Sequence, residues 1–507
     1  MRGAASEYWF PLNLAEVTMF NVRLHGLSLL LFSLFSFPLW AQQNADPDLV
    51  DAIKALDASL KETREQLRQS RTEIMELRQE VSSLRAELRP AEKSSSPEED
   101  TSVDQKINTL QEDQQLLKTQ VDDQYQTKVE SGSKYRVKLS GLLLTNLSSN
   151  SGVVNDIDVP NLAGGPYADT PGSFNATVRQ SEFGLSVNGP TVLGARTSGL
   201  LVADFYGGIA KTPNGSDFGI ARLKTGRARF DWTNTSLEVG QMEPLISPLS
   251  PTSYASWAIP ALGYSGNLWG WTSQLRVEHR WNFETWHNAL QAGIMDPLSG
   301  EYPGYAYERQ PQAGEKSRQP AIAVHDGISR ALSGRLMTVG IGGYYGRQNY
   351  LFGRNVDAWA ATADLNLPVT KWFELSGEAY RGRAIGGLWA ASGISIVASG
   401  PVPLPTTEIH GLNVIGGWAQ LKFHATPKLE FNGAWGQDNP FAADLVALGP
   451  PSPYEFVARN RTALVNVIDH PRSNLILALE YRRLNTYWTA ASPESADHVD
   501  ASVGVVF

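Results

Sequence analysis

The chain has 507 residues, a formal net charge of −9 at pH 7 and a hydrophobic content of 42%. The acidic balance gives no reason to expect nucleic acid as a partner. The absence of cysteine excludes disulfide frameworks, thiolate metal sites and cysteine nucleophiles. The eight histidines are scattered singly, so the sequence predicts no metal site and no cofactor.

The first apolar run follows Arg23 and His25 and ends at Ala41. It is too short for a spanning helix, and it has the basic flank and the small residue near its end that an export signal needs. Residues 1–41 are therefore predicted to be a signal peptide. The segment before Met19 fits no such pattern, so translation starting at Met19 is the alternative.

Residues 46–89 carry a seven-residue repeat with an apolar residue at one position of every heptad: Ile53, Leu60, Leu67, Ile74, Val81 and Leu88. This pattern predicts a left-handed coiled coil. Because a single helix cannot bury such a seam, the repeat implies partner helices, most simply from identical subunits. A solvated charged helix lying alone is the alternative.

Two prolines and a run of serines break the helical pattern over residues 90–102, which predicts a flexible linker. A shorter apolar series follows, out of phase with the first. It predicts a second short coiled segment over residues 103–130.

From residue 135 to residue 507 the apolar pattern has a period of two. About sixteen such segments follow one another, and many are near the ten residues with which a tilted strand crosses a bilayer. In residues 268–281, LWGWTSQLRVEHRW, apolar residues alternate with Arg276, Glu278 and Arg280. This segment fits either a half-buried strand of a soluble sheet or a barrel strand between lipid and a wet lumen.

The connections between these segments alternate in length. Tight connections are predicted at residues 282–284, 425–428 and 469–472, and long ones at residues 296–318 and 384–411. A barrel with short turns at one rim and long loops at the other has this rhythm. The sequence therefore predicts an all-β protein, a transmembrane antiparallel β-barrel of about 16 strands preceded by an N-terminal α-helical coiled coil.

Several tryptophans lie near the predicted strand ends, where an indole can sit at the headgroup level: Trp232, Trp269, Trp281, Trp286, Trp359, Trp372 and Trp435. In residues 268–281 we expect Leu275 and Val277 to face lipid. Trp269, Trp271 and Trp281 are expected at the two membrane interfaces.

The last segment places five apolar residues on one face: Val499, Ala501, Val503, Val505 and Phe507. A terminal aromatic residue on such a strand resembles the signal by which the barrel-assembly machinery recognises bacterial outer-membrane proteins. The expected partners are therefore this machinery, through Phe507, and outer-membrane lipid.

Several stretches resemble outer-membrane porins of the phosphate-selective type and the related dicarboxylate-type porins: ATVRQSEFGLSVNGP, LLVADFYGG, RARFDWTNTSLEVGQMEPLISPLSP, GGWAQLKFHATPKLEFNGAWGQDNP and NLILALEYRRL. The resemblance implies a homotrimer with a periplasmic coiled coil and a constriction loop, which here would run from Glu243 to Asn267. That loop contains no Lys or Arg, which departs from the phosphate-selective pattern. It offers Tyr254 and Trp257 instead.

By this resemblance Arg179, Asp204, Arg227 and Arg229 match lumen-facing positions. Alternation independently places Arg227, Arg229 and Asp231 on one face. The same alternation makes the following residues pore-lining candidates: Arg276, Glu278, Arg280, Glu374 and Glu378. Cations concentrate in the first six strands and carboxylates in the later ones, although each charge has the simpler role of pairing with a neighbour across strands.

The expected function is passive diffusion of small hydrophilic solutes, with a mild preference for anions, through a channel in the bacterial outer membrane. No catalytic residues are expected. A barrel enzyme is one alternative, although no histidine lies in a recognisable nucleophile motif. The other is an envelope anchor whose arm binds peptidoglycan and whose barrel is plugged.

Overall fold

The computed structural model describes residues 136–165, 170–210, 218–301 and 309–507. The chain divides into two units, residues 1–118 and 119–507, and all described residues belong to the second. The predicted signal peptide, coiled coil, linker and second coiled segment lie outside the described residues, so they stay predictions.

Sixteen antiparallel strands, with β2 and β3 counted together as one, close into a barrel, which confirms the predicted barrel. In chain order they are β1 (Arg136–Ser151), β2 (Gly172–Thr177) with β3 (Glu182–Val192), β4 (Ala195–Asp204), β7 (Arg222–Asp231), β8 (Thr235–Met242), β9 (Thr272–Asn282), β10 (His287–Met295), β11 (Ala321–Leu332), β12 (Arg335–Asn349), β13 (Asn355–Pro368), β14 (Phe373–Arg383), β17 (Asn413–His424), β18 (Leu429–Pro440), β19 (Val457–Arg472), β20 (Leu475–Trp488) and β21 (Glu494–Val506).

The ring closes between the first and the last strand. β1 pairs with β21 from Leu142 opposite Val506 to Ser151 opposite Asp497. The other edge of β1 pairs with β3 along Arg136–Leu142 and with β2 along Asn146–Ser151. β2 and β3 together therefore form the second strand of the barrel. Closure leaves no free strand edge, which is what a sheet needs to survive in hydrocarbon.

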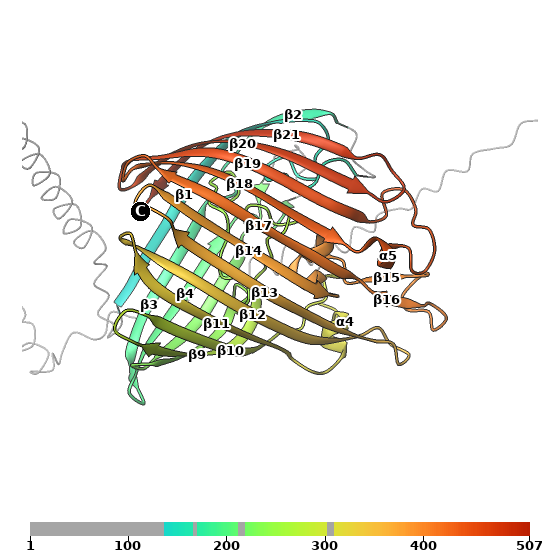
Figure 1. Cartoon of the computed structure of the whole chain (residues 1–507), viewed down its shortest axis with the longest axis horizontal. Coiled ribbons are helices and arrows are strands. Elements are labelled where there is room, and N and C mark those ends of the chain that lie inside the picture. The colour runs from blue at the N-terminus through green and yellow to red at the C-terminus, as the bar shows by residue number, and fades with distance from the viewer. Residues whose placement is uncertain (1–135, 166–169, 211–217, 302–308) are drawn as a thin grey trace, which may run out of the picture. The chain divides into compact units, whose positions relative to one another are not determined.

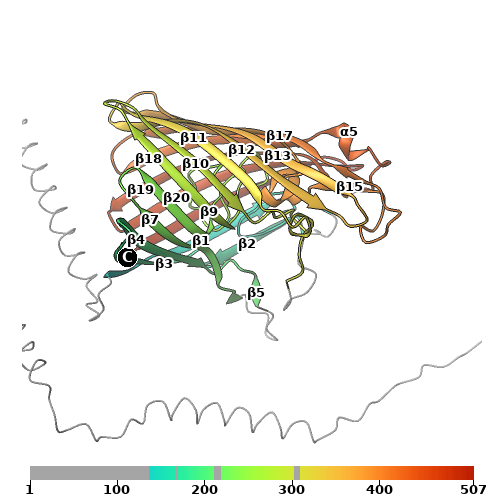
Figure 2. The ribbon, with the colours of Figure 1, turned by 90° about the horizontal axis from the view of Figure 1, so that it is seen from below.

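The hairpin turns of two to four residues lie at one end of the barrel, together with the C-terminus, and the long loops lie at the other end with the five-residue connections 350–354 and 489–493 (Figures 1 and 2). The predicted turn at residues 425–428 is correct. The predicted turn at residues 469–472 is wrong, because β19 continues to Arg472 and residues 473–474 make the turn. The strand pattern alone does not reveal where such an extension ends.

The long loops carry short elements of their own: β5 (Ile209–Ala210), β6 (Phe218–Gly219), α4 (Ala313–Lys316), η2 (Gly386–Leu388), η3 (Ala390–Gly393), β15 (Ile396–Ala398), β16 (Ile409–Gly411) and α5 (Ala442–Leu445). None of the described helices is long and apolar enough to span a membrane.

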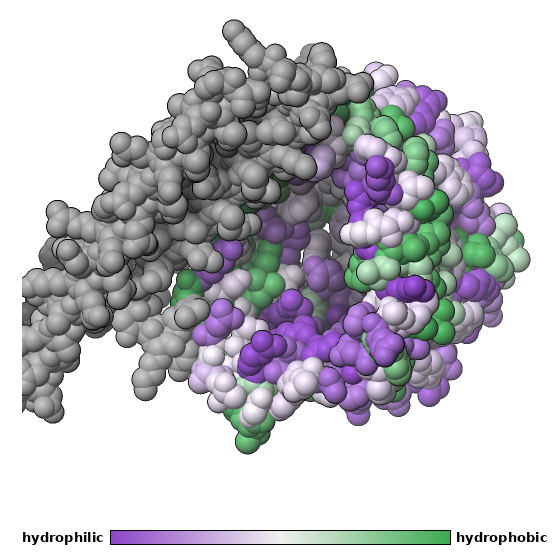
Figure 3. Space-filling model, turned by 60° about the vertical axis from the view of Figure 1, so that its left-hand side comes forward, coloured by the Kyte–Doolittle hydropathy of each residue, from purple (hydrophilic) through white to green (hydrophobic). Residues whose placement is uncertain are grey.

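Alternation separates the two faces of the wall. On β9, Leu275, Val277 and Trp281 are exposed on the outside, whereas Gln274 is buried on the inside. Figure 3 looks toward the barrel from the side of the short turns and shows hydrophilic residues around the hollow and hydrophobic residues gathered on the outer wall. An apolar exterior and a polar interior are the two surfaces that a membrane barrel needs.

Candidate functional site: the lumen

Residues 243–271, which we call the inner loop, fold into the barrel instead of standing above it. Ser247 donates from its hydroxyl to Glu378 Oε2 on β14 (2.6 Å), and the backbone N–H of Leu249 donates to Glu378 Oε1 (2.7 Å). On the facing part of the wall, Asn146 of β1 donates to the Tyr254 carbonyl (3.0 Å). The predicted constriction segment, Glu243–Asn267, therefore lies against the inner wall on both sides of the lumen.

Amide and hydroxyl side chains on the inward faces of the strands hold the rest of this loop. The Thr362 hydroxyl on β13 donates to the Ile246 carbonyl (2.7 Å). Asn466 and Asn460 of β19 donate to the carbonyls of Thr252 and Tyr264, both at 2.9 Å. Because the loop has little regular structure, these side chains satisfy backbone groups that would otherwise be buried unpaired.

The loop approaches the wall closely at Gly436 of β18. A Cβ atom built there would lie 2.2 Å from the carbonyl oxygen of Ser265. Only glycine admits backbone at that distance.

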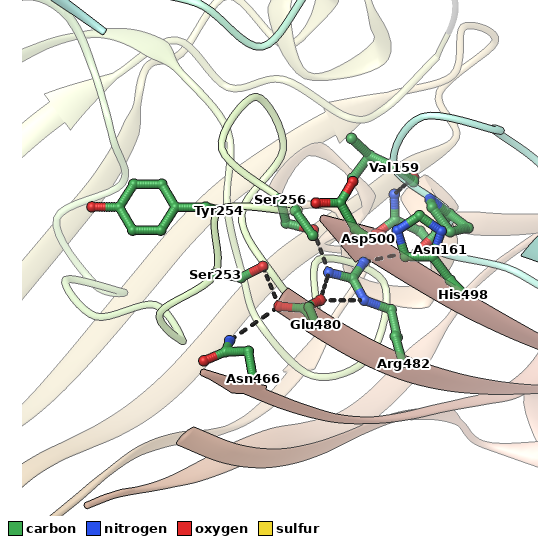
Figure 4. Close-up of polar contacts among 12 residues, drawn as sticks. Val159, Asn161, Ser253, Tyr254, Ser256, Asn466, Glu480, Arg482, His498 and Asp500 are labelled. Atoms are coloured by element: carbon green, nitrogen blue, oxygen red, sulfur yellow. Dashed lines mark hydrogen bonds and ion pairs between the residues drawn. The ribbon is translucent and has the colours of Figure 1, made fainter. Parts of the chain in front are cut away.

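An ion pair lies beneath the inner loop, on β20. Arg482 and Glu480 are almost fully buried, and Arg482 Nη2 lies 2.6 Å from Glu480 Oε1. The same nitrogen donates to the Ser256 hydroxyl (2.6 Å), and Glu480 Oε2 accepts from the Ser253 hydroxyl (2.5 Å; Figure 4). This pair fastens the middle of the loop to the wall.

Tyr254 and Trp257, the two predicted constriction residues, stack on each other. Their ring centroids are 5.4 Å apart and the ring planes differ by 8°. Both pack against Leu144 and Ile468 on the inner wall, and the Tyr254 ring points away from the Arg482 network (Figure 4). The pair is half-buried, so one part of its surface remains open to solvent.

Six predicted pore-lining residues meet at the short-turn end of β7, β8 and β9. Around them is a cluster that we call the arginine ladder: Arg196, Arg227, Arg229, Arg276 and Arg280, with the carboxylates Asp231, Glu238 and Glu278. Alternate residues on neighbouring antiparallel strands bring these side chains to one inward surface.

The carboxylates of the ladder lie between its arginines. Glu238 Oε1 accepts from Arg227 (2.9 Å) and from Arg229 (2.7 Å). Asp231 Oδ1 lies 2.9 Å from Arg280 and 3.2 Å from Arg229. Five arginines against three carboxylates leave the ladder with an excess of positive charge.

Arg276 differs from the other members of the ladder. Its guanidinium donates to the Glu243 carbonyl (2.8 Å) and to Gln274 Oε1 (3.1 Å). Among the described residues no carboxylate lies within ion-pair distance of it. It binds the start of the inner loop and adds a charge that has no direct ion-pair partner among the described residues.

The later strands present fewer accessible carboxylates than the sequence indicates. Asp364, Glu378 and Glu480 are all less than 9% exposed, because His325 or the inner loop covers them. Glu374 and Glu430 remain half-buried on either side of His424, at 3.8 and 3.6 Å.

Arg179 and Asp204 lie beside the loops rather than in the ladder. Arg179 pairs with Asp158 at 2.5 Å and stacks over the Tyr206 ring, at 4.4 Å from its centre. Asp204 is 1% exposed and pairs with Arg222 at 2.6 Å. The structure therefore places Arg179 and Asp204 where the loops attach to the barrel and not on an open lumen wall.

The expected membrane-interface positions of Trp269 and Trp271 are wrong. Trp269 is buried and stacks on Trp389 with ring centroids 4.8 Å apart. Trp271 lies over the lumenal Arg222, 4.8 Å from its guanidinium carbon. The strand begins only at Thr272, after Gly270 at a φ of +133°, so the alternation does not extend to these indoles.

The amides that hold the inner loop were not singled out from the sequence. Gln180, for example, accepts from the backbone N–H groups of Trp257 and Ala258 at 2.8 and 3.0 Å. For Asn460 and Asn466 of β19 the available signal is an inward amide on an alternating strand, whereas Gln180 lies in the turn between β2 and β3 and has no such signal. An inward amide does not distinguish a residue that binds a loop from one that faces water.

No protein-family model matches this sequence, and no curated protein matches it with significance. Among solved structures, the chain is similar to the outer membrane channel DcaP of Acinetobacter baumannii, with 14% identity over 74% of this chain and 99% of that one, and a TM-score of 0.55. At this identity the likeness shows a shared fold. It is also similar to an anion-selective porin from Comamonas acidovorans, with 10% identity over 74% and 100% of the chains and a TM-score of 0.47.

Proposed function

We propose that this chain is an outer-membrane porin, a water-filled channel for passive diffusion of small hydrophilic, predominantly anionic solutes. The closed barrel, its apolar exterior and its polar interior support this proposal. The inner loop supports it too, because it lies along the wall and narrows the bore.

The observation that carries the anion preference is the partial exposure of the ladder arginines, which outnumber the ladder carboxylates, while two carboxylates of the later strands are covered. The side chains of Arg227, Arg229 and Arg280 are 34%, 28% and 24% exposed. The carboxylates of Asp364 and Glu480 are 4% and 2% exposed. Charges in contact with lumen water act on a passing ion, whereas buried charges do so far less, so the excess of arginine over carboxylate in the ladder gives this wall a positive surface.

The test is the reversal potential of the purified protein in planar bilayers under a salt gradient. Replacing Arg229 and Arg280 by alanine should lower the anion-to-cation permeability ratio, by about twofold to tenfold. Arg483→Ala is the control, because Arg483 also forms an ion pair, with Asp497 at 2.6 Å, but it lies on the outer face. Cation selectivity of the unaltered protein would refute the anion preference.

The alternative is an envelope anchor with little or no transport. A plugged barrel would insert into a bilayer without passing current, so the conductance of the unaltered protein separates the two functions. No catalytic role is proposed for any lumenal residue.

The proposed assembly is a homotrimer joined through the N-terminal coiled coil in the periplasm. The heptad repeat supports it. A chain beginning at Ser131 should still fold as a barrel but assemble more weakly, which the mass of the particle in detergent measures. Unchanged assembly without the arm would contradict the role given to the repeat.

A further inference from the structure

The outer wall carries an aromatic groove at the short-turn end, where β9, β10 and β11 meet. It has a volume of about 700 Å³ and is lined by Trp281, Phe283, Trp286, His287, Asn288 and Ile328. Strand alternation puts Trp281 and Ile328 on the outer face, and Phe283 and Trp286 belong to the turn between β9 and β10. The groove therefore opens outward from the barrel wall and not into the lumen.

The aromatic side chains of the groove remain uncovered. Phe283 is 63% exposed, and Trp281, Trp286 and Ile328 are each more than a third exposed. Such a concave apolar surface beside a membrane rim matches a hydrocarbon chain better than it matches water.

A cation stands at the edge of this groove. Arg330 follows Ile328 on the same outward face of β11, and its guanidinium carbon lies 5.2 Å from the centre of a Trp286 ring. Arg330 is exposed and makes no ion pair with any carboxylate of the described residues. The Trp286 ring holds the guanidinium beside the groove while its N–H donors stay free for an anionic oxygen.

The polar neighbours of the groove are consistent with a headgroup at this depth. His287 Nδ1 lies 2.9 Å from Asn282 Oδ1, so the other ring nitrogen, Nε2, is not used in this contact. Asp326 Oδ1 accepts from Asn288 Nδ2 at 2.7 Å. Glu284 is exposed in the same turn, so the site suits a zwitterionic headgroup better than a purely anionic one.

From these contacts we infer that the groove binds one glycerophospholipid, with an acyl chain along Trp281, Phe283 and Ile328 and the phosphate on Arg330. Short turns of outer-membrane barrels face the periplasm. The leaflet on that side is made of glycerophospholipid, so the ligand is available there. The inference rests on the barrel lying in this membrane, as proposed above, but not on solute passage.

The test is native mass spectrometry of the full-length protein, purified from membranes in a mild detergent. The unaltered protein should retain about one phospholipid per protomer, and phosphatidylethanolamine should be retained over phosphatidylglycerol. Arg330→Gln and Trp286→Ala should each lower retention at least fivefold. Heat-dependent gel mobility verifies that each variant is folded.

The matched control is a second indole–cation pair at the same end of the barrel, in which Lys371 Nζ lies 4.9 Å from the centre of a Trp372 ring at the turn before β14. Trp372 does not line the groove, so Lys371→Gln and Trp372→Ala should leave retention unchanged. Equal retention in all variants would overturn the inference, as would retention of lipopolysaccharide alone. A conducting protein without bound phospholipid would overturn this site and leave the porin function standing.

The chain lacks cysteine, so a second copy in the groove can be detected separately. Ile328→Cys should form no disulfide-linked dimer in the membrane if lipid fills the groove. Efficient cross-linking would mean that another protomer occupies it, and would also overturn the inference.

Discussion

The Glu378 carboxylate on β14 joins the inner loop to the barrel wall, accepting from the Ser247 hydroxyl at 2.6 Å and from the Leu249 N–H at 2.7 Å. Both carboxylate oxygens are used, and Glu378 is 8% exposed. With Thr362 and Arg276, this side chain holds the first part of the loop within the lumen.

Glu378→Ala should loosen the inner loop and raise the single-channel conductance. The substitution leaves the Leu249 N–H unpaired and leaves the Ser247 hydroxyl only the Leu268 carbonyl of the loop itself, which costs about 1–3 kcal/mol of loop attachment. Glu374→Ala is the control, since Glu374 lies on the same strand and forms no hydrogen bond to the inner loop. Identical conductance of both variants and the unaltered protein would show that Glu378 does not set the bore.

Arg482→Leu should destabilise the barrel, because it leaves the buried carboxylate of Glu480 without its cation. Breaking a buried pair in this way costs about 3–5 kcal/mol. The temperature at which the detergent-solubilised barrel loses its folded gel mobility measures the change. Arg483→Leu, at the next residue but on the outer face, should lower this temperature much less. Equal effects would contradict a special role for the pair beneath the loop.

Gly340 of β12 lies between His325 of β11 and Asp364 of β13, whose side chains meet across it at 2.7 Å. A Cβ atom there would lie 2.5 Å from both bonded atoms, so Gly340→Ala should separate them and cost about 1–3 kcal/mol. Gly343→Ala on the same strand meets nothing within 4 Å and should be neutral. Thermal unfolding distinguishes the two, and similar midpoints would contradict the packing argument.

Two long loops meet through Asp444, outside the membrane-spanning strands. Burial acts to raise the pKa of Asp444, but hydrogen bonds from His410 and Asn413 outweigh it, and the pKa lies below its ordinary value of 3.8. The ionised carboxylate therefore stabilises this contact above about pH 3.8, and the contribution is lost as the pH falls through the lower folded value.

Hydrogen exchange of the Asn413 amide, which donates to Asp444 Oδ2 at 2.8 Å, measures this loss. After correction for intrinsic rates, its protection should be constant above about pH 3.8 and should fall as the pH is lowered below that value. The Leu412 amide, which donates to the Ser395 carbonyl, is the control. In Asp444→Asn the Asn413 amide should lose this pH dependence, and a dependence that persists would point to another group.

The strands of the barrel could be predicted from the sequence because apolar and polar residues alternate within each strand, and this alternation shows which side chains face out and which face in. Leu275 and Val277 lie outside, and Arg276 and Glu278 inside, as alternation indicates. The arginine ladder follows from the same rule applied to four neighbouring strands, β4, β7, β8 and β9. A short turn then fixes the register of the two strands that it joins, and the sequence indicates where most of these turns lie.

The loops could not be predicted in the same way because their contacts are distant in sequence. Ser247 and Glu378 are 131 residues apart, and nothing local to either of them indicates the other. Trp269 and Trp271 were misplaced for a related reason, since Gly270 ends the regular pattern and turns both indoles inward. Alternation also gives the face of a carboxylate but not whether a loop covers it.

Single-channel recording of the full-length protein in planar bilayers tests the central claim most directly. An open, wet bore beside the inner loop predicts stepwise, ohmic current from each inserted particle, with a reversal potential on the anion side of zero under a salt gradient. Insertion of folded protein without current would contradict it.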